Sequence, residues 1–102
     1  MPGNENIKRR HFQILQLISA IRNSFDGSVA VYTQGGCFQF YLILRAAWSD
    51  AQPWYDGVEG HVLTKLGKRF YDITGEIRQP NVYPLAREPR IARSAHRWSY
   101  PL

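Results

Sequence analysis

The sequence predicts a single α+β domain. The chain has 102 residues, 44% of them hydrophobic and 21% charged, which is enough material for one domain with a modest core. Two segments carry apolar residues at helical spacing, and residues 61–66 and 68–74 carry the pattern of a β-hairpin. These observations predict two helices and a small antiparallel sheet.

The first predicted helix covers about residues 6–24. Its apolar residues recur at spacings of three, four and seven, which places them on one face. They are Ile7, Ile14, Leu15, Ile18, Ile21 and Phe25. Asp26 and Gly27 end the pattern, and the β-branched residues of 28–34 predict a short strand.

The second predicted helix begins at Cys37, after Gly35 and Gly36. Nearly every position from Cys37 to Trp48 is apolar, so we expect burial over most of the helix circumference. This segment is long enough for about three helical turns and ends in good helix formers, which favours a central helix over a strand.

A turn-rich passage over residues 54–60 precedes the hairpin, whose strands meet at Gly67. The segment after Gly75 is rich in proline, which predicts an extended tail that either wraps the domain or stays loose. Residues 1–5 and about 77–102 are therefore predicted to be peripheral extensions of the domain.

Composition excludes several classes of protein. The chain has no uncharged apolar run of about 18 residues and no apolar signal-peptide segment, so we expect a cytoplasmic protein without membrane contact. Its lone cysteine cannot form an internal disulfide or a thiolate-rich metal site. His11 and His96 have no ligand-spaced partners, so we predict no metal and no cofactor.

The formal net charge is +5, and the basic residues are clustered. A basic balance favours acidic partners such as nucleic acid or an acidic protein surface, although solvated arginines also serve plain solubility. The candidate contact residues are Lys8, Arg9 and Arg10 near the start and Arg87, Arg90, Arg93 and Arg97 near the end.

Cys37, His61 and Asp72 form the candidate reactive site. A helix start lowers the pKa of a thiol, and flanking glycines let a substrate carbonyl approach it. His61 opens one strand of the hairpin and Asp72 closes the other, so the two side chains are predicted to be adjacent. The histidine would move the thiol proton while the carboxylate orients the ring. For a lone cysteine, the simpler alternative is a buried thiol packed in the core.

The segments Gly35-Gly36-Cys37-Phe38, Gly60-His61-Val62 and Phe70-Tyr71-Asp72 resemble the pattern of papain-like and transglutaminase-like proteins. In those families a cysteine begins the central helix, a histidine begins a strand and an aspartate lies on the next strand. The resemblance spans about residues 33–76 and implies a reduced form of the site. It implies Cys37 as nucleophile, His61 as general base and acid, Asp72 as orienting carboxylate, and Gln34 and Gly36 as oxyanion support.

Two functions from different classes follow. The first is a thiol-dependent acyl transferase or hydrolase, such as a peptidase, deamidase or transglutaminase, acting on a protein or peptide. The alternative is a non-catalytic binding or inhibitor protein of the kind found in phages and mobile elements, built on the same fold and working by surface contact. Nucleic-acid binding through the basic clusters is a third and less favoured function.

Overall fold

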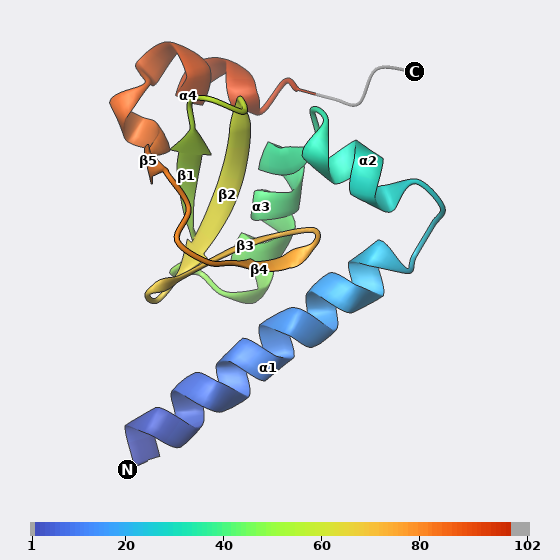
Figure 1. Ribbon diagram of the computed structural model, residues 1–102, viewed down its shortest axis with the longest axis vertical. Helices are drawn as coiled ribbons and strands as arrows, with labels where there is room; N and C mark the ends of the chain where they lie inside the picture. Colours follow the sequence, from blue (N-terminus) through green and yellow to red (C-terminus); the bar gives the residue numbers. More distant parts are fainter. Residues whose placement is uncertain (1, 99–102) are drawn as a thin grey trace.

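The computed structural model describes residues 2–98, with side chains described from Asn6 onward, and it confirms an α+β fold (Figure 1). Met1 and residues 99–102, the ends of the two predicted extensions, lie outside the described residues. The elements in chain order are α1 (Pro2–Arg22), α2 (Ser28–Thr33), α3 (Cys37–Ala47), β1 (Gln52–Asp56), β2 (His61–Leu66), β3 (Arg69–Asp72), β4 (Gly75–Ile77), β5 (Tyr83–Pro84), the 3₁₀ helix η1 (Leu85–Arg87) and α4 (Pro89–Ala95).

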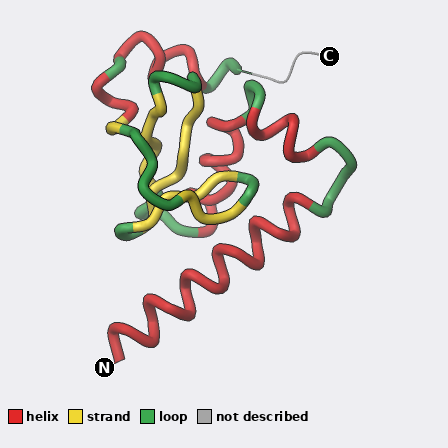
Figure 2. The backbone as a smooth tube through the Cα atoms, in the orientation of Figure 1, coloured by secondary structure: helices red, strands yellow, loops and turns green. Residues whose placement is uncertain are grey.

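The strands, drawn in yellow in Figure 2, form one antiparallel sheet. Their order in the sheet is β4-β3-β2-β1-β5. The predicted hairpin is confirmed as β2 and β3, which pair with Thr64 opposite Tyr71 and Leu66 opposite Arg69. Gly67 begins the turn with a φ of 63°, a conformation that glycine adopts without a steric penalty. The hairpin fixes which residues of the two strands share a face.

Helix α3 begins at Cys37, as predicted, and packs against the sheet. Cys37, Phe40, Tyr41 and Leu44 are buried at helical spacing. The expected burial over most of the circumference is wrong, because Leu42 and Ile43 are 42% and 36% exposed. An apolar run cannot reveal by itself that the sheet covers only one side of a helix.

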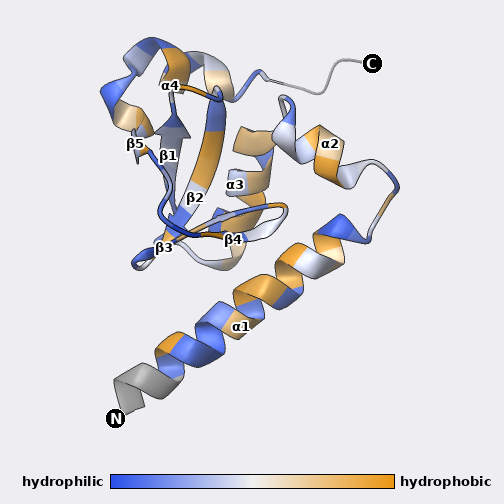
Figure 3. Cartoon of the chain, viewed as in Figure 1, coloured by the Kyte–Doolittle hydropathy of each residue, from blue (hydrophilic) through white to orange (hydrophobic). Residues whose placement is uncertain are grey.

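Helix α1 is longer than predicted and starts at Pro2. From Asn6 onward, Ile14 and Ile18 are the buried residues of this helix, and they lie in the half next to α2 and β4. Figure 1 shows the N-terminal half extending past the rest of the fold. Figure 3 shows that apolar residues are concentrated in the C-terminal part of this helix.

The predicted strand over residues 28–34 is wrong, because these residues form α2. Gly27 adopts a left-handed φ of 85° and redirects the chain after α1. Tyr32 then packs on Phe40 of α3, with ring centroids 5.6 Å apart. Packing against a neighbouring helix thus overrides the β propensity of the valines in this segment.

The passage predicted as turns over residues 54–60 contains most of a strand instead. β1 covers Gln52–Asp56 and lies between β2 and β5. The rings of Trp54 and Phe70 pack edge-on with their centroids 5.3 Å apart, a contact that only the folded sheet creates. The turn starts at Asp56, whose Oδ1 accepts hydrogen bonds from the N–H groups of Val58 and Glu59.

The proline-rich segment packs back onto the domain over residues up to 98, but the predicted extended conformation is wrong, because the segment forms β5, η1 and α4. Its prolines occupy permitted places, since Pro84 lies in the edge strand β5 and Pro89 is the first residue of α4. Leu85 and Ala95 are buried in the core, so this segment contributes to packing. Among the described helices, none is both long and apolar enough to cross a bilayer.

Candidate functional site

Cys37 lies at the first position of α3, and its side chain points into the core. It is 2% exposed, and its Sγ atom accepts a hydrogen bond of 3.4 Å from the backbone N–H of Val62 in β2. The helix start is therefore attached to the sheet through the thiol. The position matches the prediction, while the burial matches the simpler alternative of a core cysteine.

His61 and Asp72 are adjacent, as predicted. Their Nε2 and Oδ2 atoms are 3.3 Å apart across β2 and β3. The two residues are diagonal neighbours on one face of the hairpin, because Thr64 opposite Tyr71 sets the register. The orientation of the Asp72 carboxylate is also fixed by Thr74, because Oδ1 accepts hydrogen bonds from the backbone N–H and the hydroxyl of that residue.

The charges in this pair stabilise each other. Burial lowers the pKa of His61, but contacts with Asp72 and Cys37 outweigh it and raise that pKa to about 9. Burial raises the pKa of Asp72, but hydrogen bonds from His61 and Thr74 prevail and hold it below its ordinary value. Both shifts favour the imidazolium–carboxylate form of this pair, whose side chains are only 14% and 10% exposed.

The structure brings all three predicted residues together but closes the site. Nδ1 of His61 is buried and meets no geometric criterion for a hydrogen bond among the described residues, although the Cys37 thiol lies close enough to contribute to the raised pKa of the ring. Two surface hollows, one beside α1 and one along β4, are both lined by other residues. The arrangement connects α3 to the hairpin and holds the Cys37 side chain 2% exposed.

Gln34 and Gly36 lie beside this site with structural contacts of their own. Gln34 is exposed at the end of α2, where its backbone N–H bonds to the Ala30 carbonyl. The Gly36 N–H donates to the Val31 carbonyl at 2.8 Å. A Cβ on residue 36 would lie 2.6 Å from that same oxygen, so glycine is required for the close approach between the α2 end and the α3 start.

The basic candidates form two separate clusters. Lys8, Arg9 and Arg10 lie on the projecting half of α1, where Arg10 pairs with Asp50 at 2.7 Å. The second cluster lies around η1 and α4, at the other end of the longest axis of the fold (Figure 1). Its members, all exposed, are Arg87, Arg90, Arg93 and Arg97.

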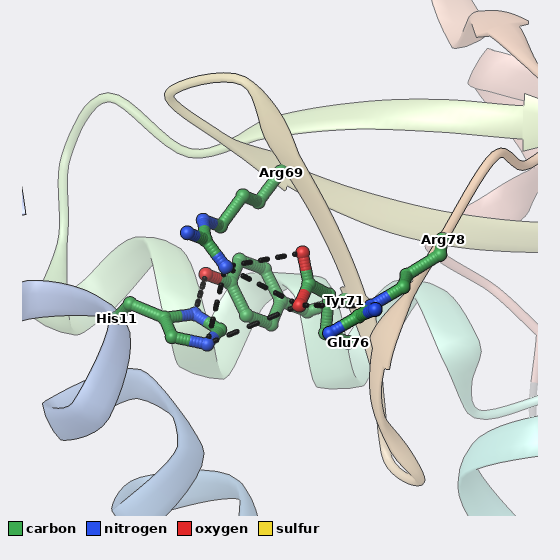
Figure 4. Close-up of polar contacts among 5 residues, drawn as sticks. All are labelled: His11, Arg69, Tyr71, Glu76 and Arg78. Carbon is green, nitrogen blue, oxygen red and sulfur yellow. Dashed lines mark hydrogen bonds and ion pairs between the residues drawn. The ribbon is translucent and has the colours of Figure 1, made fainter. Parts of the chain in front are cut away.

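Sequence reasoning missed a polar cluster between α1 and the hairpin (Figure 4). An Arg69 guanidinium nitrogen lies 3.3 Å from His11 Nε2 and 3.3 Å from Glu76. A guanidinium can only donate, so Nε2 accepts and Nδ1–H donates to the Tyr71 hydroxyl at 2.7 Å. Burial raises the pKa of Tyr71 to about 12, so its hydroxyl stays protonated.

The helical spacing of α1 could have indicated this cluster. His11 lies three residues before the buried Ile14, so it is on the side of the helix that faces the sheet. No grouping of three His, Cys, Asp or Glu side chains suited to a metal ion occurs within residues 6–98. The hydrogen bonds of the cluster connect α1 to β3 and β4.

A comparison with protein families matches residues 14–100 to the family described as Phage YunG-like protein. The comparisons with curated proteins and with solved structures give no match. The matched family overturns the assignment to papain-like and transglutaminase-like proteins, and with it the hydrolase and catalytic-triad designations. The residue order that suggested them is real, but three residues with short flanking segments are a weak family signature.

Proposed function

This chain belongs to the Phage YunG-like family, and we propose that it acts as a phage-type, non-catalytic binding protein with a protein target. The family match carries the proposal, because it covers residues 14–100 of the chain and favours the binding alternative over thiol chemistry.

The closed state of the thiol supports this function. An acyl-transfer nucleophile must meet a substrate carbonyl, yet Cys37 is 2% exposed and its sulfur is directed to the Val62 N–H. Both Asp72 oxygens and Nε2 of His61 are engaged in contacts within the hairpin. These are the contacts expected of a structural polar network.

The surface of α1 supports binding as well. Ile7 and Phe12 are large apolar residues that are 60% and 62% exposed. Apolar side chains left exposed on a surface are available for contact with a partner protein. The surrounding basic residues give such a surface a preference for acidic partners.

The test compares the tagged chain with its Cys37→Ser variant in a bacterial lysate. We expect both forms to recover the same protein in the same yield, reversibly, with the intact mass of the chain unchanged. Circular dichroism of the variant confirms folding. Failure of either form to recover a protein, loss of recovery on Cys37→Ser in a folded chain, or a covalent adduct on Cys37 would contradict the proposal.

A further inference from the structure

The apolar stripe of α1 continues beyond the region that the sheet covers. Ile14 and Ile18 are 1% exposed, whereas Ile7, two turns before Ile14 on the same face, is 60% exposed. The residues between them on this face are Arg10 and His11. Arg10 and His11 contact Asp50 and Tyr71, so Ile7 is the apolar residue of this face that the rest of the described chain leaves uncovered.

A hollow of about 520 Å³ lies between this face and the turn that joins β2 to β3. We call it the α1 groove. Its apolar lining includes Ile7, Ile14, Leu66 and Tyr71, and its cationic lining includes Arg10 and Lys68. This volume falls within the range of ligand-binding pockets, about 300–1,000 Å³, and has room for an apolar side chain of a partner.

The floor of the α1 groove is held in place before any partner binds. Tyr71 is 1% exposed and accepts the hydrogen bond from His11, while Arg69 bonds to both His11 and Glu76 (Figure 4). These contacts join the two walls. A groove with fixed walls loses little conformational freedom when a partner enters.

The charges around the α1 groove determine which charge a partner should carry. Arg10 and Arg69 each have an acidic neighbour, Asp50 and Glu76. Lys68 has no ion-pair partner among residues 6–98, and Lys8 and Arg9 add positive charge to the adjacent helix surface. The balance is positive and complements carboxylates.

A second hollow, of about 650 Å³, shares Lys68 and Arg69 with the α1 groove and continues along β4 to Arg78. Arg78 is 88% exposed in its side chain. An extended acidic segment that places an apolar residue in the α1 groove would meet further cations on this side. The two hollows together fit a segment rather than a single small ion.

The lining favours a protein partner over nucleic acid. Non-specific binding of single strands relies on exposed aromatic faces for base stacking. The aromatic ring of the α1 groove, Tyr71, is buried, and Phe70 in the second hollow is half-buried and packs edge-on against Trp54. The accessible wall of the α1 groove is the aliphatic Ile7. An aliphatic wall beside cations fits a peptide that alternates acidic and apolar side chains.

We propose that the α1 groove binds an acidic segment of a partner protein, with an apolar side chain of that segment inserted beside Ile7 and its carboxylates facing Lys68. This inference rests on the proposed function and adds the site and the chemistry of the target.

The experiment selects binders to the full chain from a displayed library of random peptides. We expect the selected peptides to carry Asp or Glu beside Leu, Ile or Phe. Lys68→Glu should weaken their binding about fivefold by reversing a rim charge, and Ile7→Ser about tenfold by removing apolar contact area.

Matched controls change the same chemistry elsewhere. Arg90→Glu reverses a charge on α4, and Val58→Ser replaces an apolar residue that is 83% exposed in the β1–β2 turn. Both should leave peptide binding within about twofold, as expected of substitutions outside the contact. Circular dichroism of each variant confirms that the fold is retained.

The inference would be overturned if the library gave no enrichment or enriched basic or neutral peptides. It would also be overturned if the groove and control variants had equal effects on peptide binding. Displacement of the peptides by a DNA duplex that binds the wild type and the Ile7→Ser variant equally well would overturn it too. A target recovered from the lysate by wild type, Cys37→Ser and both groove variants alike would leave the proposed function standing and remove the groove as its site. Loss of recovery on Cys37→Ser alone would instead remove the proposed function.

Discussion

His61 Nε2 lies 3.3 Å from Asp72 Oδ2, and this contact joins the first residue of β2 to the last residue of β3. With the Cys37 thiol beside the ring, it forms a polar network where α3 meets the hairpin. The same three residues that suggest a reactive site in the sequence therefore hold the fold together.

The His61–Asp72 pair should make stability depend on pH. The pKa of His61 is about 9 when folded against an ordinary 6.5, so its stabilisation is complete below about pH 6.5 and is lost as pH rises through 9. The folded pKa of Asp72 is lowered, so its stabilisation is present above its ordinary value of 3.8 and declines as pH falls below it. Urea unfolding over this pH range tests both limits.

Asp72→Asn should destabilise the chain by about 2 kcal/mol near pH 6, because it leaves a half-buried imidazole without its counter-ion. Asn keeps an oxygen that can accept the Thr74 N–H, so the turn itself is preserved. Asp56→Asn is the matched control, since Asp56 caps a turn in the same way. Equal losses in both variants, or a loss that does not diminish toward pH 9, would contradict the ion-pair role of Asp72.

Cys37→Ala should destabilise more than Cys37→Ser. Both remove the sulfur, but serine keeps an acceptor for the Val62 N–H, whereas alanine leaves that buried donor unpaired at a further loss of about 1 kcal/mol. The free energy of unfolding of both variants measures the difference. A more stable alanine variant would mean that packing of the thiol, and not its hydrogen bond, dominates at this position.

The Cys37 thiol of the native chain should react with iodoacetamide only as fast as the chain opens, because the side chain is 2% exposed. The rate should therefore rise steeply in urea, and mass spectrometry follows the reaction. Rapid alkylation without denaturant would show an accessible thiol and remove a main support for the binding function.

Gly36→Ala should destabilise by about 2 kcal/mol through overcrowding, because its Cβ would stand 2.6 Å from the Val31 carbonyl oxygen. Gly27→Ala separates this effect from backbone strain. Gly27 has a φ of 85°, but a Cβ added there would meet nothing within 4 Å, so its loss should be about 1 kcal/mol. Thermal unfolding of both variants shows which substitution costs more stability. A larger loss of stability in Gly27→Ala than in Gly36→Ala would exclude the steric explanation.

Leu85→Ala should destabilise by about 3 kcal/mol, because this residue of the proline-rich segment is 2% exposed in the core. Leu42→Ala, at a residue 42% exposed on α3, is the control and should lose under about 1 kcal/mol. Similar losses in urea unfolding would mean that the segment is a peripheral extension after all.

Asp50→Asn should strengthen the binding of acidic peptides to the α1 groove about twofold. Asp50 neutralises Arg10 from an exposed position, so its removal makes the rim more positive with little change in stability. Glu59→Gln removes the same charge in the exposed β1–β2 turn and should leave affinity unchanged. Titration by fluorescence anisotropy compares the two, and weaker binding by Asp50→Asn would contradict the charge argument.

Features that depend on local pattern could be predicted from the amino-acid sequence. The three-and-four spacing of α1, the helix start at Cys37 after two glycines and the β2–β3 hairpin around Gly67 all follow from neighbours in the chain. The adjacency of His61 and Asp72 also followed, because hairpin pairing is set by residues close in sequence.

Contacts between distant segments account for the features that the sequence did not predict. Residues 28–34 became helical because α3 offers Tyr32 a packing surface, and β1 formed despite Pro53 because β2 and β5 supply its partners. The burial of Cys37 and the α1 groove likewise depend on elements far apart in the chain. Local pattern shows which face of a helix is apolar, but whether that face is covered or left open to a partner depends on how distant elements pack.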